Sequence, residues 1–185
     1  QNFSPSYPTA QVMDLTFNND GTKMYIVGNQ NNDVSEYNLS TAFDVSTASY
    51  VQNFSVASQE ATPTGMSFNN DGSKMFVTGM SSGIGGSGRD VNEYSLTTAF
   101  DVSTASYVQN FSVKAQENYP QGITFNSNGT KMFIIGHASD DVIEYSLSTA
   151  FDVSTASYTQ VFSVRPQSNT PTGLTFNNDG TKMFV

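Results

Sequence analysis

The chain has 185 residues, enough to bury a core, and its 16 Asp and Glu against 7 Lys and Arg give a net charge of −9. This acidity argues against nucleic acid or an anionic membrane surface as a partner, because clustered cations bind both. Cysteine is absent, which excludes disulfides and thiol chemistry, and no apolar run approaches the roughly 18 residues of a membrane-spanning helix.

Uncharged polar residues dominate the composition. Only 12% of the residues are charged, and the shortage of Lys and Glu argues against exposed helices. Such polarity, combined with β-branched and aromatic residues, is typical of secreted or virion-exposed β proteins, so we expect an extracellular, virion-surface or cell-surface location. The chain opens at Gln1 rather than Met, and we interpret it as a mature or excised segment without a visible signal peptide.

The first predicted element is a hairpin. A strand at 12–17 and another at 23–27 flank the turn 18–21, Asn-Asn-Asp-Gly. Asn and Asp side chains bond their own backbone in such turns, and Gly supplies the positive φ. The motif follows four Phe residues spaced 51, 57 and 51 apart: Phe17, Phe68, Phe125 and Phe176.

Two further strands complete the unit, at 34–39 and 50–56. Between them lies the segment 41–50, which recurs letter for letter at 98–107 and 149–158. Its Asp-Val-Ser-Thr predicts one capped turn, with Asp accepting free amides. The later units repeat the strands at 66–68, 74–78, 91–96 and 107–113, then at 123–125, 131–135, 142–147 and 158–164, and finally at 174–176 and 182–185.

Four short strands recurring at about 51 residues predict an all-β fold, a β-propeller of four-stranded antiparallel blades. A Gly/Ser-rich insert around 81–88 lengthens the second unit. We treat 1–185 as a single domain holding about 3.5 blades, with units at 1–51, 52–108, 109–159 and a half unit at 160–185.

The order of strand, Asn/Asp-Gly turn, Lys, apolar run and Val-x-x-Tyr-x-Leu resembles the propeller repeats called YVTN or TolB-like, and more distantly WD-repeat and kelch blades. The resemblance spans nearly the whole chain. That family includes surface-layer proteins, periplasmic scaffolds and lactonase-like enzymes, so the resemblance implies a propeller and leaves the function open.

The sequence does not decide how the propeller ring is closed. The opening Gln1-Asn2-Phe3-Ser4 matches a fourth strand, and 182–185 matches a second strand. Propellers usually close with 4–8 blades. The chain is therefore a piece of a longer propeller, or one of two copies that complete a ring as a homo-oligomer, or an open solenoid.

Candidate ligand-binding residues are those that break the repeat, because a residue present in every blade, such as the Glu of each third strand, more often has a structural role. Asp14 replaces the Gly found at its position in later units and would point toward a central channel. Ile84 lies in the insert, with Arg89 at its base, and His137 and Asp140 lie in a loop of the third unit. Loops on a rigid scaffold often carry binding residues. A solvated surface role is the alternative for each.

Metal and catalytic chemistry have weaker support. Asp33, Asp90 and Asp141 begin the third strands and offer hard oxygen ligands suited to Ca²⁺, yet no stretch has the spacing of a calcium loop. The chain has one His and no Cys, so no nucleophile and base pair emerges. We expect no catalytic residues and no cofactor, with Ca²⁺ as the one candidate considered.

Together these patterns favour a non-catalytic, secreted or particle-surface propeller module that binds a glycan or protein through its blade loops. The first alternative is a lactonase-like hydrolase with a metal near the channel. The second is a structural spacer in a surface array or phage fibre.

Overall fold

The structure is a computed structural model that describes residues 11–81 and 88–185. Ile84, one of the predicted ligand residues, lies outside the described residues. The described chain forms three four-stranded antiparallel sheets and a two-stranded one, and each follows the chain order. None of its helices has the length and apolar character of a membrane-spanning segment.

The sheets are called blades 1 to 3. Blade 1 contains β1 (Val12–Phe17), β2 (Lys23–Gly28), β3 (Asp33–Leu39) and β4 (Ala48–Ser55). Blade 2 contains β5 (Pro63–Phe68), β6 (Lys74–Gly79), β7 (Asp90–Leu96) and β8 (Ala105–Ser112). Blade 3 contains β9 (Pro120–Phe125), β10 (Lys131–Gly136), β11 (Asp141–Leu147) and β12 (Ala156–Ser163). A terminal hairpin pairs β13 (Thr175–Phe176) with β14 (Met183–Phe184).

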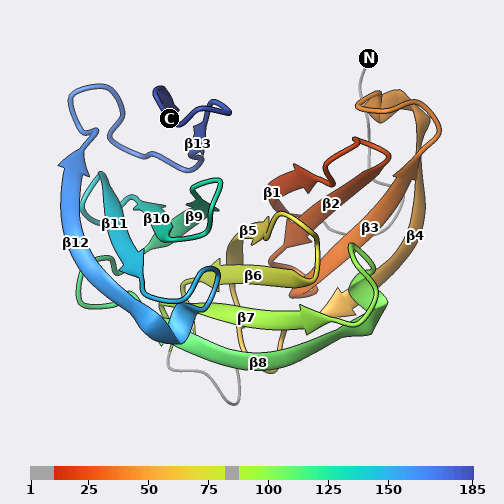
Figure 1. Ribbon diagram of the computed structural model, residues 1–185, viewed down its shortest axis with the longest axis horizontal. Helices are drawn as coiled ribbons and strands as arrows, with labels where there is room; N and C mark the ends of the chain where they lie inside the picture. Colours follow the sequence, from red (N-terminus) through yellow and green to blue (C-terminus); the bar gives the residue numbers. More distant parts are fainter. Residues whose placement is uncertain (1–10, 82–87) are drawn as a thin grey trace.

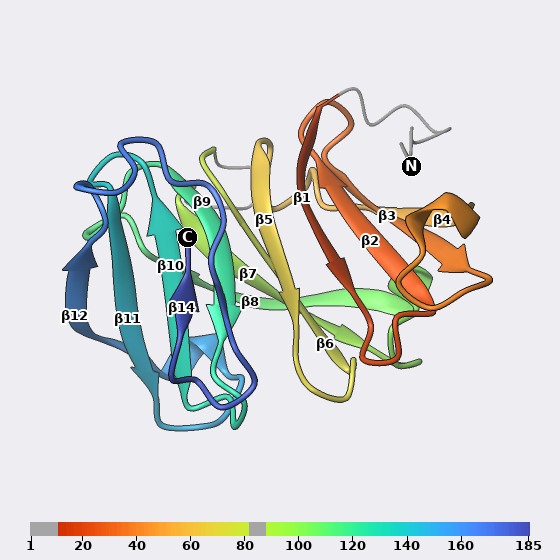
Figure 2. The same cartoon turned by 90° about the horizontal axis from the view of Figure 1, so that it is seen from above.

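The blades stand side by side in an open arc, with β1, β5 and β9 on the inside and β4, β8 and β12 on the outside (Figure 1). The view from above shows successive blades leaning face to face (Figure 2). The predicted all-β propeller fold with four-stranded blades is therefore confirmed, and the ring is not closed. The observed sheets do not begin and end at the limits of the predicted units. Those limits, after residues 51, 108 and 159, fall within β4, β8 and β12.

The Asn/Asp-Gly turns form as their chemistry requires. In the first, the Asn18 side chain accepts from the Lys23 amide at 2.9 Å and Asp20 accepts from the Thr22 amide at 3.0 Å. Gly21 has φ +71°, and a Cβ there would lie 2.4 Å from the Phe43 ring. Only Gly allows both this conformation and this contact, so the turn also fixes the loop between β3 and β4.

That loop contains the predicted capped turn. In each blade the Asp of Asp-Val-Ser-Thr accepts from the Ser amide two residues later and begins a short 3-10 helix: η1 (Val45–Thr47), η2 (Val102–Thr104) and η3 (Val153–Thr155). Hydrogen bonding to Ser103 lowers the pKa of Asp101, as expected for a carboxylate that caps free amides. The prediction of a single capped turn is confirmed.

Apolar side chains fill the space between blades. Blade 2 is covered on both faces: Tyr94 meets Phe54 of blade 1 edge to face at 5.6 Å, and Phe76 meets Phe125 of blade 3 at 4.5 Å. Strands buried on both faces lose the simple alternation of apolar and polar residues, which explains the nearly continuous burial of β6 and β7. The core is thus divided among the interfaces of adjacent blades.

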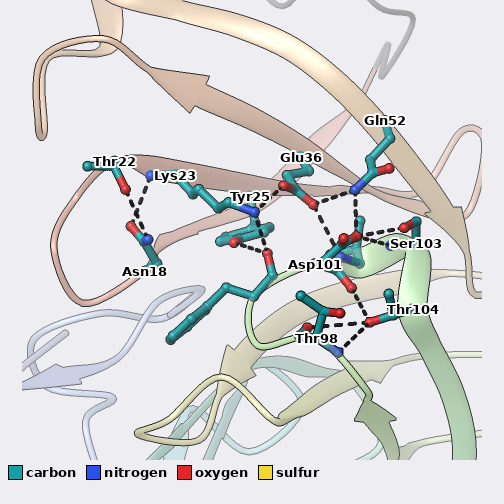
Figure 3. A network of polar contacts seen from close by, with 12 residues as sticks. Asn18, Thr22, Lys23, Tyr25, Glu36, Gln52, Thr98, Asp101, Ser103 and Thr104 are labelled. Atoms are coloured by element: carbon teal, nitrogen blue, oxygen red, sulfur yellow. Dashed lines mark hydrogen bonds and ion pairs between the residues drawn. The ribbon is translucent and has the colours of Figure 1, made fainter.

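A polar contact also joins adjacent complete blades, and Figure 3 shows the one between blades 1 and 2. Glu36 of blade 1 is 1% exposed and forms an ion pair with Lys23 at 2.6 Å. Its other oxygen accepts from the Gln52 side chain at 2.9 Å and from the Val102 amide of blade 2 at 3.2 Å. Gln52 donates in turn to Asp101 at 2.7 Å. The Glu of each third strand is therefore structural, as its repetition predicted.

Candidate functional site

One end of the blades gathers most of the predicted site residues. Neighbouring strands of a blade are antiparallel and follow the chain order. The start of the first strand therefore lies at the same end of the blade as the end of the second strand, the start of the third strand and the end of the fourth strand. The pairing of Val12 with Gly28, of Gly28 with Asp33 and of Asp33 with Ser55 shows this in blade 1. We call it the loop end. It holds Asp14, Arg89, His137 and Asp140, together with Asp33, Asp90 and Asp141.

Asp14 lies on the innermost strand and links two blades. Its carboxylate accepts from the Met66 amide of β5 at 3.0 Å and from the Leu15 amide at 2.8 Å. Burial raises its pKa to about 6, although both amide bonds act in the opposite direction. Asp14 also lines an open hollow of about 520 Å³ between β1 and the segment 170–175. Asp14 therefore contributes to the lining of this hollow, and its oxygens are partly used by backbone amides.

The raised pKa gives a pH prediction. A carboxyl with a folded pKa of about 6 binds its proton more tightly in the folded state, so stability falls as pH rises from about 4 to about 6. We expect Asp14→Asn to remove about 1–2 kcal/mol of that fall, a discounted figure because the group is only half-buried. Urea unfolding of both proteins at pH 4, 5, 6 and 7 measures this, and parallel pH profiles would contradict it.

Two further carboxylates at the loop end were missed from the sequence. Glu60 accepts from the Thr62 amide at 2.8 Å and from the Ser81 amide at 3.0 Å, and burial raises its pKa to about 7. Glu117 likewise accepts from the Tyr119 amide at 2.6 Å and from the Ser139 hydroxyl at 2.8 Å. Each of these two carboxylates links the connection that leads into a blade with the loop between the second and third strands of that blade. The Gln-Glu pair shortly before a Pro was the available signal.

An exposed aromatic pair lies at the loop end. The rings of Tyr119 and His137 stack with centroids 5.2 Å apart and planes 9° apart. Tyr119 is 46% exposed and His137 is exposed as well. Arg89 of blade 2 donates from Nε to the Asn118 carbonyl at 3.1 Å, which places its side chain beside the pair. We call Tyr119, His137 and Arg89 the aromatic platform.

All three platform residues break the repeat. The equivalents of Tyr119 are Thr62 and Thr170, and the equivalents of His137 are Asn29 and Met80. His137 and Arg89 were predicted as site residues, and the structure brings them to the same place. Tyr119 was missed because it lies in the Pro-containing connection, which looked like a simple crossing between blades.

Asp140 differs from Asp14, Arg89 and His137, the other described ligand-binding candidates, because it is buried. Its carboxylate lies 3.7 Å from the Arg165 guanidinium, and its carbonyl accepts from the Val164 amide at 3.0 Å. Like Arg89 and Asn32 at the same loop position, it has a positive φ, here 59°. This geometry gives Asp140 a role in shaping the loop.

Two of the three calcium candidates accept hydrogen bonds from side-chain amides. Asp33 accepts from Asn53 at 2.6 Å and Asp90 accepts from Asn110 at 2.7 Å, and both carboxylates are buried. Asp141 begins the third strand of blade 3. Across residues 11–81 and 88–185, no group of three or more His, Cys, Asp or Glu side chains is arranged to hold a metal ion.

No protein-family model and no curated protein matches the sequence. Solved structures do match. A periplasmic gluconolactonase from Pseudomonas aeruginosa aligns at TM-score 0.56 and 15% identity, over 86% of this chain and 40% of that one. A hydrazine synthase from Kuenenia stuttgartiensis aligns at TM-score 0.62 and 11% identity, over 99% of this chain and 43% of that one.

A 6-phosphogluconolactonase candidate from Bacteroides uniformis aligns at TM-score 0.58 and 16% identity, over 89% of this chain and 46% of that one. This chain spans 38 to 41% of the first three structures it matches. At such identities the likeness shows the fold alone. The chain therefore has a propeller-type repeat of the kind found in lactonase structures.

Proposed function

We propose that this chain is a non-catalytic propeller module of a secreted or particle-surface protein and that it binds a glycan at its loop end. The observation that supports this most directly is the aromatic platform, an exposed stacked pair that breaks the repeat beside a cation. The likeness to YVTN and TolB-like repeats stays a prediction, since the neighbours support a propeller-type repeat and not that particular family.

The chemistry of the platform suits a sugar. The apolar C–H face of a pyranose packs on a flat aromatic ring, while its hydroxyls need polar partners at the ring edge. The Tyr119 hydroxyl, the His137 nitrogens and the Arg89 guanidinium supply donors and acceptors there. The fixed blades hold these loops in place, so little order is lost on binding.

Five of the described carboxylates support the non-catalytic part of the proposal, because structural contacts occupy them. Glu36 and Glu93 join blades, and Glu60 and Glu117 cap loop amides. Asp14 accepts from two backbone amides.

Replacing Tyr119 by Ala tests the proposal. Loss of the stacked ring should weaken glycan binding at least tenfold, because truncation of a central aromatic contact costs about 1.5 kcal/mol or more. A glycan array with labelled protein identifies the ligand, and titration calorimetry measures affinity. Tyr158→Ala is the matched control, since Tyr158 is 47% exposed at the start of β12, away from the loop end. A silent array, or equal loss in both variants, would contradict a glycan site and leave a protein ligand.

A second candidate function is lactone hydrolysis. It rests on the names of the neighbouring lactonases and on the Asp14 carboxyl, whose raised pKa and place beside the central hollow suit an acid or base. Assay of gluconolactone hydrolysis with wild type and Asp14→Asn decides it. Activity that depends on Asp14 would replace the binding hypothesis. The spacer hypothesis depends on self-association, which the following inference addresses.

A further inference from the structure

The contact between complete blades occurs twice with the same partners. Between blades 2 and 3, Glu93 forms an ion pair with Lys74 at 2.7 Å and accepts from Gln109 at 2.9 Å and from the Val153 amide at 3.1 Å. Gln109 donates to Asp152 at 2.7 Å, and Lys74 donates to the Phe151 carbonyl at 2.7 Å. These distances match those around Glu36, so the contact is a reproducible unit.

Each contact has two halves. One is a Lys, Glu and Gln triplet on the second, third and fourth strands of a blade, which we call the socket. The other is the Phe-Asp-Val loop of the following blade, whose carbonyl, carboxylate and amide meet the triplet. The loop cannot meet its partners unless the two blades are side by side, so this pairing specifies which faces pack together.

Blade 3 also has a socket, and the side of it that would meet a loop is more exposed than in blades 1 and 2. Lys131 pairs with Glu144 at 2.8 Å, and Gln160 donates to Glu144 at 2.9 Å, as in the other blades. The Glu144 side chain is 13% exposed, against 1–2% for Glu36 and Glu93. A groove of about 290 Å³ lies beside it, lined by Phe133, Val142, Phe162 and Phe176 among others. Phe162 is 61% exposed, whereas its equivalents in blades 1 and 2 are partly buried.

Blade 1 has the matching loop at the other end of the arc. Its Phe43, Asp44 and Val45 repeat the loop residues of blades 2 and 3. Phe43 is 59% exposed, and Val45 is partly exposed where Val102 and Val153 are fully buried. On the same blade, Leu15 of β1 is 50% exposed, while its equivalent Met66 in β5 is 3% exposed.

We propose that two copies of this chain associate through these ends, with the Phe43-Asp44-Val45 loop of one copy in the blade 3 socket of the other. Charge and hydrogen-bonding groups match by sequence identity: Asp44 would accept from Gln160, the Val45 amide would donate to Glu144, and Lys131 would meet the Phe43 carbonyl. Each copy offers one loop and one socket, so the same contact used twice joins two arcs into a closed pair.

The apolar surfaces support the same arrangement. Exposed Phe43 and Leu15 at one end and exposed Phe162 at the other would be covered, as their equivalents are between blades 1 and 2. Exposed apolar side chains gathered on one face typically mark a contact surface. Figure 1 shows β4 and β12 at opposite ends of the arc.

The terminal hairpin occupies the inner part of the blade 3 face, where Phe176 contacts Phe133 at 4.7 Å. Blade 1 of a second copy would replace it, because Phe17, Lys23 and Met24 repeat Phe176, Lys182 and Met183. The hairpin pairs only two residues per strand, whereas β1 and β2 are six residues each and belong to a complete sheet. The exchange therefore adds the third and fourth strands and their loop to the contact.

The test is the mass of the 185-residue chain in solution, measured by sedimentation and light scattering between about 1 and 100 µM. We expect two chains for wild type. Asp44→Ala and Gln160→Ala should each raise the dissociation constant at least tenfold, which corresponds to the loss of about one charge-assisted hydrogen bond. Asp20→Ala, on an exposed turn, is the control and should leave the mass unchanged.

Mixing Asp44→Ala with Gln160→Ala should restore part of the two-chain species, because one contact in the mixed pair has both an intact loop and an intact socket. This also excludes simple misfolding of either variant. A single-chain mass at every concentration would overturn the proposal, as expected if further residues of the same polypeptide cover the socket. A two-chain mass insensitive to Asp44→Ala would overturn it as well.

Discussion

Replacement of Glu93 by Ala should lower the free energy of unfolding by about 3–5 kcal/mol, the range measured when one partner of a buried ion pair is removed. Glu93 is 2% exposed, and its two oxygens accept from Lys74, Gln109 and the Val153 amide. Truncation removes the acceptor that these three donors share at the interface of two blades; Lys74 keeps the Phe151 carbonyl and Gln109 keeps Asp152 as partners. The cost of unsatisfied buried donors exceeds the net value of the bonds themselves, so the interface as a whole is weakened.

Glu144→Ala is the matched control for this prediction. Glu144 lies in blade 3 at the position equivalent to Glu93, on the third strand and with equivalent Lys and Gln partners. It is more exposed than Glu93 and has only these two side-chain partners among the described residues. Its removal should cost about 1 kcal/mol, as for an exposed pair. Urea unfolding followed by circular dichroism compares the two variants, at protein concentrations low enough to keep the chain single. Equal losses would show that the contact to the next blade adds nothing to stability.

The local elements of the fold could be predicted from the sequence because their causes are local. The turn at Gly21 and the cap at Asp44 each depend on atoms within a few residues, so their residue types identify them. The period then predicts repeated sheets, since a unit with four short strands must cover its faces with its neighbours. The predicted strand limits agree with the observed ones within two residues, except that the first strands of blades 2 and 3 were predicted at 66–68 and 123–125 and are observed at Pro63–Phe68 and Pro120–Phe125.

The contacts between blades could not be predicted in the same way. Glu93 and the Val153 amide are 60 residues apart, and their partnership depends on how two sheets lean together. The exact repetition of the loop around Asp101 was visible and now has a physical reason, because each loop enters the same type of socket. The platform residue Tyr119 was missed for a related reason: its stacking on His137 joins a connection to a hairpin loop.

A substitution on an inner strand should also have a large effect on stability, because Gly65 lies where β5 approaches β9. A Cβ on Gly65 would lie 2.6 Å from the Gln121 carbonyl oxygen and 2.8 Å from the Gly122 Cα. Both are backbone atoms, which cannot move away without separating the strands. Gly65→Val should therefore lower the free energy of unfolding by about 3 kcal/mol, at the upper end of the cost of overpacking.

Gly173→Val is the control, since a Cβ at this equivalent position meets nothing within 4 Å. It should change stability by less than about 0.5 kcal/mol. The equivalent Asp14 explains why a side chain at this position is compatible with blade 1: its carboxylate accepts from the Met66 amide and so bridges to β5. Val has no such acceptor and can only push the strands apart. If thermal unfolding showed the same midpoint for Gly65→Val and Gly173→Val, close approach of the inner strands would not be what sets the spacing of the blades.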